Sequence, residues 1–160
     1  MTDMLERSAH LPEVQLAAGE VLIEDGTSTG SVWVLVSGAL RVTKHGVTVN
    51  VINHPGSLIG EVAALLGRGH TATVEAAEPT TLRYARDGGA LLSTDPGVSH
   101  LVAVGLAERL DFVTTYLADL RNQYGDAPGL AMVPDVLRLL AERQGPPARP
   151  GSARDPDPEY

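Results

Sequence analysis

One short segment in the middle of the chain holds a glycine, an acid, a histidine and a threonine close together. Residues 60–74 read GEVAALLGRGHTATV, so that Gly60 and Glu61 stand before an apolar run and His70 and Thr71 follow it. We interpret the run as a short helix between strands. N–H groups at a helix start attract anions, a glycine lets the backbone approach a ligand, and an adjacent acid can accept a sugar hydroxyl. The segment therefore predicts a phosphate site.

The residues around this segment, from about 13 to 86, have the sequence pattern of an all-β unit. Short apolar or alternating runs are separated by single glycines, a pattern typical of a jelly roll or small barrel. The run Val32–Val36 is apolar throughout, so it should be buried on both faces with Trp33 in the core. The pairs Ser37–Gly38 and His45–Gly46 suit tight reversals and predict consecutive hairpins. The predicted strands span residues 13–16, 20–23, 32–36, 40–43, 47–52, 71–76 and 81–85.

Helical patterns replace the strands after Asp87. A short helix is expected to end near Leu92, and Pro96 can open a long helix that runs to about Tyr124. The long helix carries an apolar heptad strip, which consists of Ala103, Leu106, Leu110, Val113, Leu117 and Leu120. That strip fits either packing on the chain's own barrel or self-association. We favour self-association, because a second strip, Ala107, Phe112 and Tyr116, could face the barrel instead.

The predicted domain organisation has three parts. Residues 1–124 form one domain with the β unit and the long helix, and residues 125–144 are a helical appendage in which 134–143 is one short amphipathic helix. Residues 145–160 contain five prolines and almost no apolar side chains, which predicts a disordered tail.

Composition excludes several classes of function. A formal charge of -8 and a pI near 5.0 argue against direct DNA binding, which uses basic side chains to displace counterions from phosphates. The absence of cysteine excludes disulfides and thiolate chemistry. We see no signal peptide, membrane span or catalytic constellation, and the histidines lie too far apart for a cupin-type metal site. We therefore expect a cytoplasmic protein that is not an enzyme, with no metal and no membrane contact.

The order of glycines, strands and the central segment resembles the cyclic nucleotide-binding domain, the sensor module of Crp/Fnr-type regulators, protein kinase A regulatory subunits and cyclic nucleotide-gated channels. The resemblance spans roughly residues 11–124, and it rests on Leu16–Ile23, Asp25–Gly26, Val32–Gly38, Gly60–Glu61 and Ala72–Val74. It implies a β-roll that holds the ligand, a short helix within a phosphate-binding cassette, and a long C-terminal helix that closes over the nucleotide or dimerises beside it.

The resemblance also implies roles for single residues of the cassette. Gly60, Val62 and Ala63 would offer backbone N–H groups to the cyclic phosphate, Glu61 would bind the ribose 2'-hydroxyl, and Thr71 could donate to the phosphate.

The family's phosphate-binding arginine is replaced in this chain by His70. Histidine offers one donor in that direction and is mostly neutral at pH 7, whereas arginine is always charged and contacts two oxygens. Arg68 could partly replace that charge if the Gly67–Gly69 loop folds inward, or it could point into solvent.

These features lead to two hypotheses. The first is a stand-alone, non-enzymatic regulator that binds a cyclic mononucleotide, cyclic AMP or cyclic GMP with cyclic AMP favoured, without any tightly bound cofactor. It would signal through an effector protein and form a homodimer through the 96–124 helix. The second is a degenerate domain that has lost the ligand and acts as a protein interaction module. A different anionic ligand, such as a cyclic dinucleotide, is a third possibility.

Overall fold

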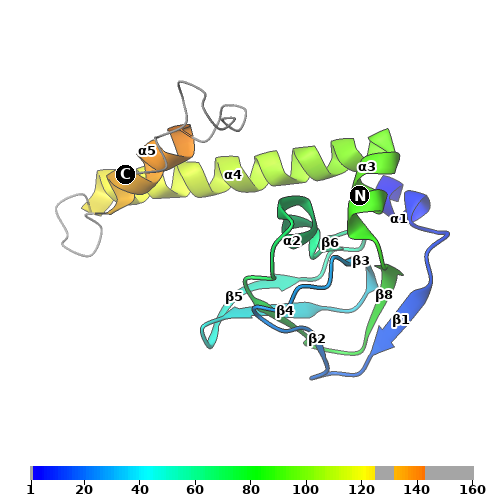
Figure 1. Ribbon diagram of the computed structural model, residues 1–160. Helices are drawn as coiled ribbons and strands as arrows, with labels where there is room; N and C mark the ends of the chain where they lie inside the picture. The colour runs from blue at the N-terminus through cyan, green and yellow to red at the C-terminus, as the bar shows by residue number, and fades with distance from the viewer. Residues whose placement is uncertain (1, 125–131, 143–160) are drawn as a thin grey trace, which may run out of the picture. The chain divides into compact units, whose positions relative to one another are not determined.

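The computed structural model describes residues 2–124 and 132–142, and it is shown in Figure 1. The chain divides into two compact units, residues 1–105 and 106–160. The predicted domain limits at residues 124 and 144 stay predictions, and the proposed tail at 145–160 lies outside the described residues.

The first unit is built on two antiparallel sheets of four strands each. The fold is therefore mainly β with flanking helices, as the sequence predicts (Figure 1). The first sheet has the order β1 (Glu13–Leu16), β8 (Thr80–Ala85), β3 (Val32–Ser37) and β6 (Leu58–Ile59). The second has the order β2 (Val21–Ile23), β7 (Thr73–Ala76), β4 (Leu40–Lys44) and β5 (Val47–Ile52).

The core consists of aliphatic side chains from both sheets. Leu35, Leu40 and Leu82 are fully buried in one cluster, which also includes Trp33. Burial of one such leucine stabilises the fold by about 1.5–3 kcal/mol relative to an exposed leucine. The predicted burial of β3 on both faces is confirmed, since its first four residues are all buried.

The connections between the middle strands differ from the prediction in one place. β4 and β5 form the predicted hairpin, in which both His45 and Gly46 have positive φ. β3 and β4, however, lie in different sheets, so the predicted hairpin at Ser37–Gly38 is wrong. Gly38 crosses between the sheets with φ 94°, and a Cβ atom there would stand 2.5 Å from the Thr80 hydroxyl oxygen. Close packing against the β7–β8 turn explains this glycine.

The described helices are α1 (Thr2–Arg7), α2 (Glu61–Leu66), α3 (Gly88–Thr94), α4 (Pro96–Tyr124) and α5 (Val133–Glu142). The predicted helices of the central segment and of residues 96–124 are confirmed, and the short helix expected to end near Leu92 ends at Thr94. α1 and the two-residue strand β6 were not predicted. β7 begins at Thr73 and not at Thr71, because the chain before it pairs with the β2–β3 loop.

Candidate functional site

The site begins at Gly60, which caps the start of α2 with φ 87°. A Cβ atom at this position would lie 2.8 Å from the carbonyl oxygen of Ser31 and 3.3 Å from Trp33 Cζ3. Both the left-handed backbone and this close approach require glycine. A hydrogen bond runs from the Ala64 N–H to the Gly60 carbonyl at 3.1 Å, so the N–H groups of residues 61–63 lie in the first turn, before the helix ladder begins.

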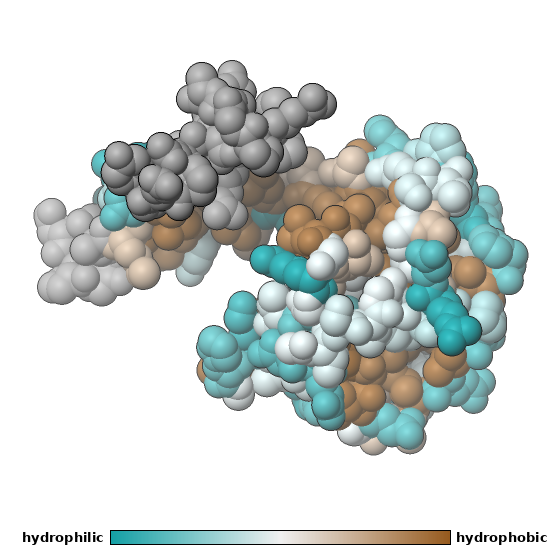
Figure 2. Space-filling model, viewed as in Figure 1, coloured by the Kyte–Doolittle hydropathy of each residue, from teal (hydrophilic) through white to brown (hydrophobic). Residues whose placement is uncertain are grey.

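The side chains of α2 divide into an inner and an outer set. Glu61 and Ala63 are buried, at 5% and 9% exposure. Val62, Leu65 and Leu66 are exposed, and Figure 2 shows apolar surface where α2 lies. The helix start thus places a carboxylate inward beside backbone N–H groups, where the helix dipole favours negative charge.

His70 closes the other end of the segment and faces inward. It is 7% exposed, and its Nε2 lies 3.0 Å from the Thr29 hydroxyl oxygen. The backbone N–H of His70 donates to the Thr27 carbonyl at 2.8 Å, and the backbone carbonyl of His70 accepts from the Gly26 N–H at 2.8 Å. Burial lowers the pKa of His70, so the imidazole is neutral at pH 7. His70 therefore joins the cassette to the β2–β3 loop.

Arg68 and Thr71 lie on the surface at either side of His70. Gly67 ends α2 in the left-handed conformation, with φ 59°, and the Arg68 N–H donates to the Ala63 carbonyl at 3.2 Å. The structure thus gathers Gly60, Glu61, Val62 and Ala63 at one helix start and sets His70 beside Gly60. Arg68 and Thr71 are accessible to solvent.

Three hydroxyl side chains, of Thr29, which contacts His70, and of Ser31 and Tyr84, were not among the predicted site residues. Thr29 Oγ1 accepts from the Ser31 N–H at 3.2 Å, and Ser31 Oγ lies 3.3 Å from Tyr84 Oη. The Tyr84 ring lies 5.7 Å from Trp33, between ring centroids. For Thr29 and Ser31, the sequence signal was the run of threonines, serines and glycines from residue 26 to residue 31.

The described ranges, 2–124 and 132–142, hold neither a metal-binding cluster nor a single membrane-spanning helix. No three histidine, cysteine or acidic side chains there are grouped so that they could hold a metal ion. No single helix in these ranges has the length and apolar composition for a membrane span, although α3 and α4 pass that test jointly across a bend of 103°.

The cyclic nucleotide-binding domain family model matches residues 13–87. The matched range contains the eight strands of the first unit and α2. Residues 13–87 form a cyclic nucleotide-binding domain. The recognised resemblance is thereby confirmed, and domains of this family are typically regulatory and not catalytic.

Solved structures have a similar fold. The catabolite activator protein of Thermus thermophilus has a TM-score of 0.59 and 24% identity, over 91% of this chain and 88% of that chain. A protein of a cyclic-GMP-dependent bacterial signalling pathway that regulates phytopathogenesis has a TM-score of 0.60 and 21% identity, over 69% of this chain and 94% of that one. The N-terminal domain of a Streptomyces coelicolor transcriptional regulator has a TM-score of 0.50 and 26% identity, over 68% and 84% respectively. A comparison with curated protein sequences finds no match.

Proposed function

We propose that this protein is a non-enzymatic regulator that binds a 3',5'-cyclic mononucleotide in its cyclic nucleotide-binding domain. The observation that carries the proposal is the start of α2, where Gly60 has a positive φ and the Glu61 carboxylate is buried within a domain of this family. The backbone N–H groups of Gly60, Val62 and Ala63 would bind the cyclic phosphate, and Glu61 would accept a hydrogen bond from the ribose 2'-hydroxyl.

The positive charge for the phosphate is assigned in this proposal to Arg68. His70 is buried and neutral, so a charged contact from its imidazole would first require protonation against the cost of burial. Arg68 is exposed and stands between Gly67 and Gly69, whose backbone freedom would let the loop bring the guanidinium toward the phosphate. Thr71, also exposed, would add a hydroxyl donor.

The output is proposed to pass through α4 to an effector protein and not directly to DNA. The net charge of -8 disfavours a phosphate backbone as partner. Leu110 and Val113 of the heptad strip are 44% and 47% exposed, which supports a homodimer contact along α4. Sedimentation velocity would test this contact: Leu110→Glu should shift a dimer to monomer, while the matched exposed change Asp111→Asn should leave it. A monomeric wild-type protein would refute the homodimer.

The decisive experiment is calorimetric titration of the purified protein with cyclic AMP and cyclic GMP, with cyclic dinucleotides as a panel. We expect heat and thermal stabilisation with a cyclic mononucleotide, and tighter binding of cyclic AMP. Arg68→Ala should weaken binding about tenfold or more, the equivalent of one hydrogen bond to a charged group. Lys44→Ala, which removes the same charge from the β4–β5 hairpin, is the control. No heat and no stabilisation at millimolar ligand would refute the sensor function.

A second function, a ligand-independent interaction module, is favoured by one observation. The position of the family's arginine holds a histidine that contacts Thr29 and packs near Trp33. If the cassette is only structural, His70→Arg should not create ligand binding and should destabilise the fold, because it places a charge in this buried site. Binding gained by His70→Arg would instead support a phosphate site that has lost affinity.

A further inference from the structure

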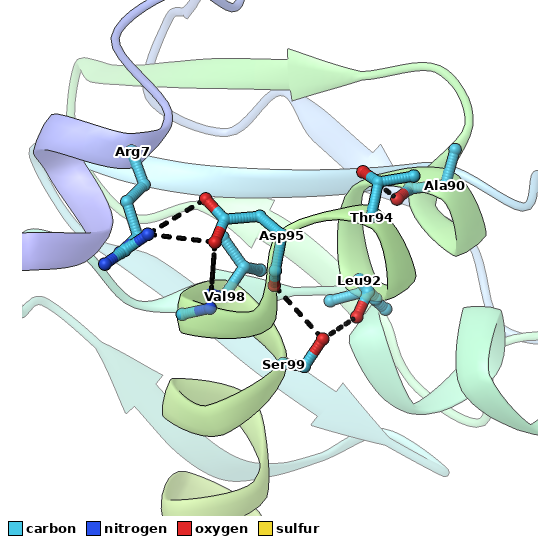
Figure 3. Close-up of polar contacts among 8 residues, drawn as sticks. Arg7, Ala90, Leu92, Thr94, Asp95, Val98 and Ser99 are labelled. Carbon is cyan, nitrogen blue, oxygen red and sulfur yellow. Dashed lines mark hydrogen bonds and ion pairs between the residues drawn. The ribbon is translucent and has the colours of Figure 1, made fainter.

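The corner between α3 and α4 is held by one carboxylate. Asp95 precedes α4, and its Oδ1 accepts from the Gly97 N–H at 2.8 Å and the Val98 N–H at 3.4 Å, as an N-cap does. Ser99 Oγ donates to the Leu92 carbonyl at 2.6 Å, which ties the first turn of α4 back to α3 (Figure 3). All of these residues belong to the first compact unit.

The same carboxylate binds a side chain from the other end of the unit. Arg7, the last residue of α1, places Nη1 at 2.9 Å from Asp95 Oδ1 and 3.0 Å from Oδ2 (Figure 3). Its guanidinium also lies over Gly97, where a Cβ atom would stand 2.1 Å from Arg7 Cζ. The hydrogen bond from Gly97 and the contact with Arg7 both lower the pKa of Asp95. The position of the Arg7 guanidinium therefore depends on both the Asp95 carboxylate and the absence of a side chain at Gly97.

α1 is fixed to the β-roll as well. Arg83 of β8 donates through Nη1 to the Leu5 carbonyl at 2.5 Å, and Nη1 lies 3.4 Å from Ser8 Oγ. Met4 and Ser8 are buried, at 4% and 1% exposure. The helix is thus anchored on one side to the first sheet and on the other side to the start of α4.

α3 connects this corner to the cassette. The Gly88 N–H at the start of α3 donates to the Gly30 carbonyl at 2.9 Å. A Cβ atom at Gly88 would stand 2.5 Å from Val32 Cγ2 and 3.2 Å from Ala64 Cβ of α2. α3 therefore packs directly on the cassette helix, and its seven residues connect that contact to Asp95.

We propose that α1 is a clamp, in which Arg7 locks the start of α4 to the β-roll through Asp95 and the surface of Gly97. Because of this clamp, α1 and the first turn of α4 move together and not separately. The regulatory consequence of the clamp rests on the proposed function. If ligand binding moves α3 and the start of α4, then either α1 moves with them or the Arg7–Asp95 ion pair breaks. An interaction that holds or removes α1 would then control α4.

Hydrogen exchange of the ligand-free protein tests the clamp without assuming a ligand. In Arg7→Lys, which keeps the charge but lacks the planar guanidinium that lies over Gly97, and in Arg7→Ala, the amides of Gly97, Val98 and α1 should exchange faster together. The increase should be about two- to fivefold, the range that a partly exposed ion pair supports. Amides of β3 should not change. The control is Arg41→Ala, which removes the Arg41–Glu75 pair on the second sheet. Unchanged exchange at Gly97 and Val98, or faster exchange at only one of the two helices, overturns the proposal.

A second pair of variants tests the contact with Gly97. Alanine favours a helix over glycine, so Gly97→Ala should raise the melting temperature where nothing opposes it. In the wild type the new methyl group would displace the Arg7 guanidinium from Asp95. The gain should therefore be larger in the Arg7→Ala background than in the wild type. Equal gains in both backgrounds would show that Arg7 does not rest on Gly97. Because neither readout involves a nucleotide, the clamp and the ligand-binding proposal can fail separately.

Discussion

The sharpest prediction compares two left-handed glycines at the two ends of α2. Gly60 has φ 87° and Gly67 has φ 59°, so alanine is strained at either position, at a cost of about 1–2 kcal/mol. The surroundings differ: a Cβ atom at Gly67 meets nothing within 4 Å, whereas one at Gly60 would stand 2.8 Å from the Ser31 carbonyl oxygen. That oxygen belongs to the backbone and cannot swing aside, so the overlap should add about 1–3 kcal/mol.

We therefore expect Gly67→Ala to lower the free energy of unfolding by about 1–2 kcal/mol and Gly60→Ala by about 2–5 kcal/mol. Urea denaturation followed by fluorescence measures both values, because the chain has a single tryptophan, Trp33, in the core beside Gly60. The entropy change of the unfolded chain is the same for the two substitutions and cancels in the comparison. Equal losses for the two variants would show that the contact with Ser31 does not determine the glycine at position 60.

Three further predictions concern the rest of the first unit. Burial lowers the pKa of His70, so the folded protein binds this proton at lower pH than the unfolded chain, and its contribution to stability is complete above about pH 6.5 and declines below it. The melting temperature of His70→Gln should accordingly fall less than that of the wild type between pH 7.5 and 5.5, and parallel curves would contradict this. Thr80→Val should cost about 1–3 kcal/mol in urea unfolding, since Thr80 Oγ1 accepts from the Ala39 N–H, and Thr81→Val is the matched control. Leu82→Ala should cost about 2–5 kcal/mol by the same measurement, and a smaller loss would mean that the core collapses around the cavity.

The sequence predicted most strands because apolar runs and glycines mark them clearly. β1 and β5 were predicted with the bounds that they have, and the long helix begins at Pro96, where the proline ring suits the first turn. β6 has only two residues, too few for any periodicity to show. Ser37–Gly38 has the composition of a hairpin turn, but its conformation is determined by Thr80, which is distant in the sequence.

The cassette was located from sequence, while the directions of its side chains were not. A Gly-Glu pair before an apolar run indicates a helix start, and the structure has α2 there. The inward orientation of His70 depends on Thr29, which lies 41 residues away, and no local pattern encodes such a contact. The Arg7–Asp95 pair could not be predicted for the same reason, since its two residues lie 88 positions apart in the sequence.

The pairing of β1 with β8 has a consequence for how the protein folds. Glu13 lies opposite Arg83 and Leu16 opposite Thr80, so the first sheet joins the two ends of the β-roll. Forming these distant contacts carries an entropic cost, because the long chain between the two strands must be closed into a loop. Folds with many contacts between distant residues tend to fold slowly. During synthesis, β1 must wait until β8 has left the ribosome before it has a partner. Until then β1 and β3 each lack their shared neighbour, and the exposed strand edges are sites where nascent copies of this chain would associate.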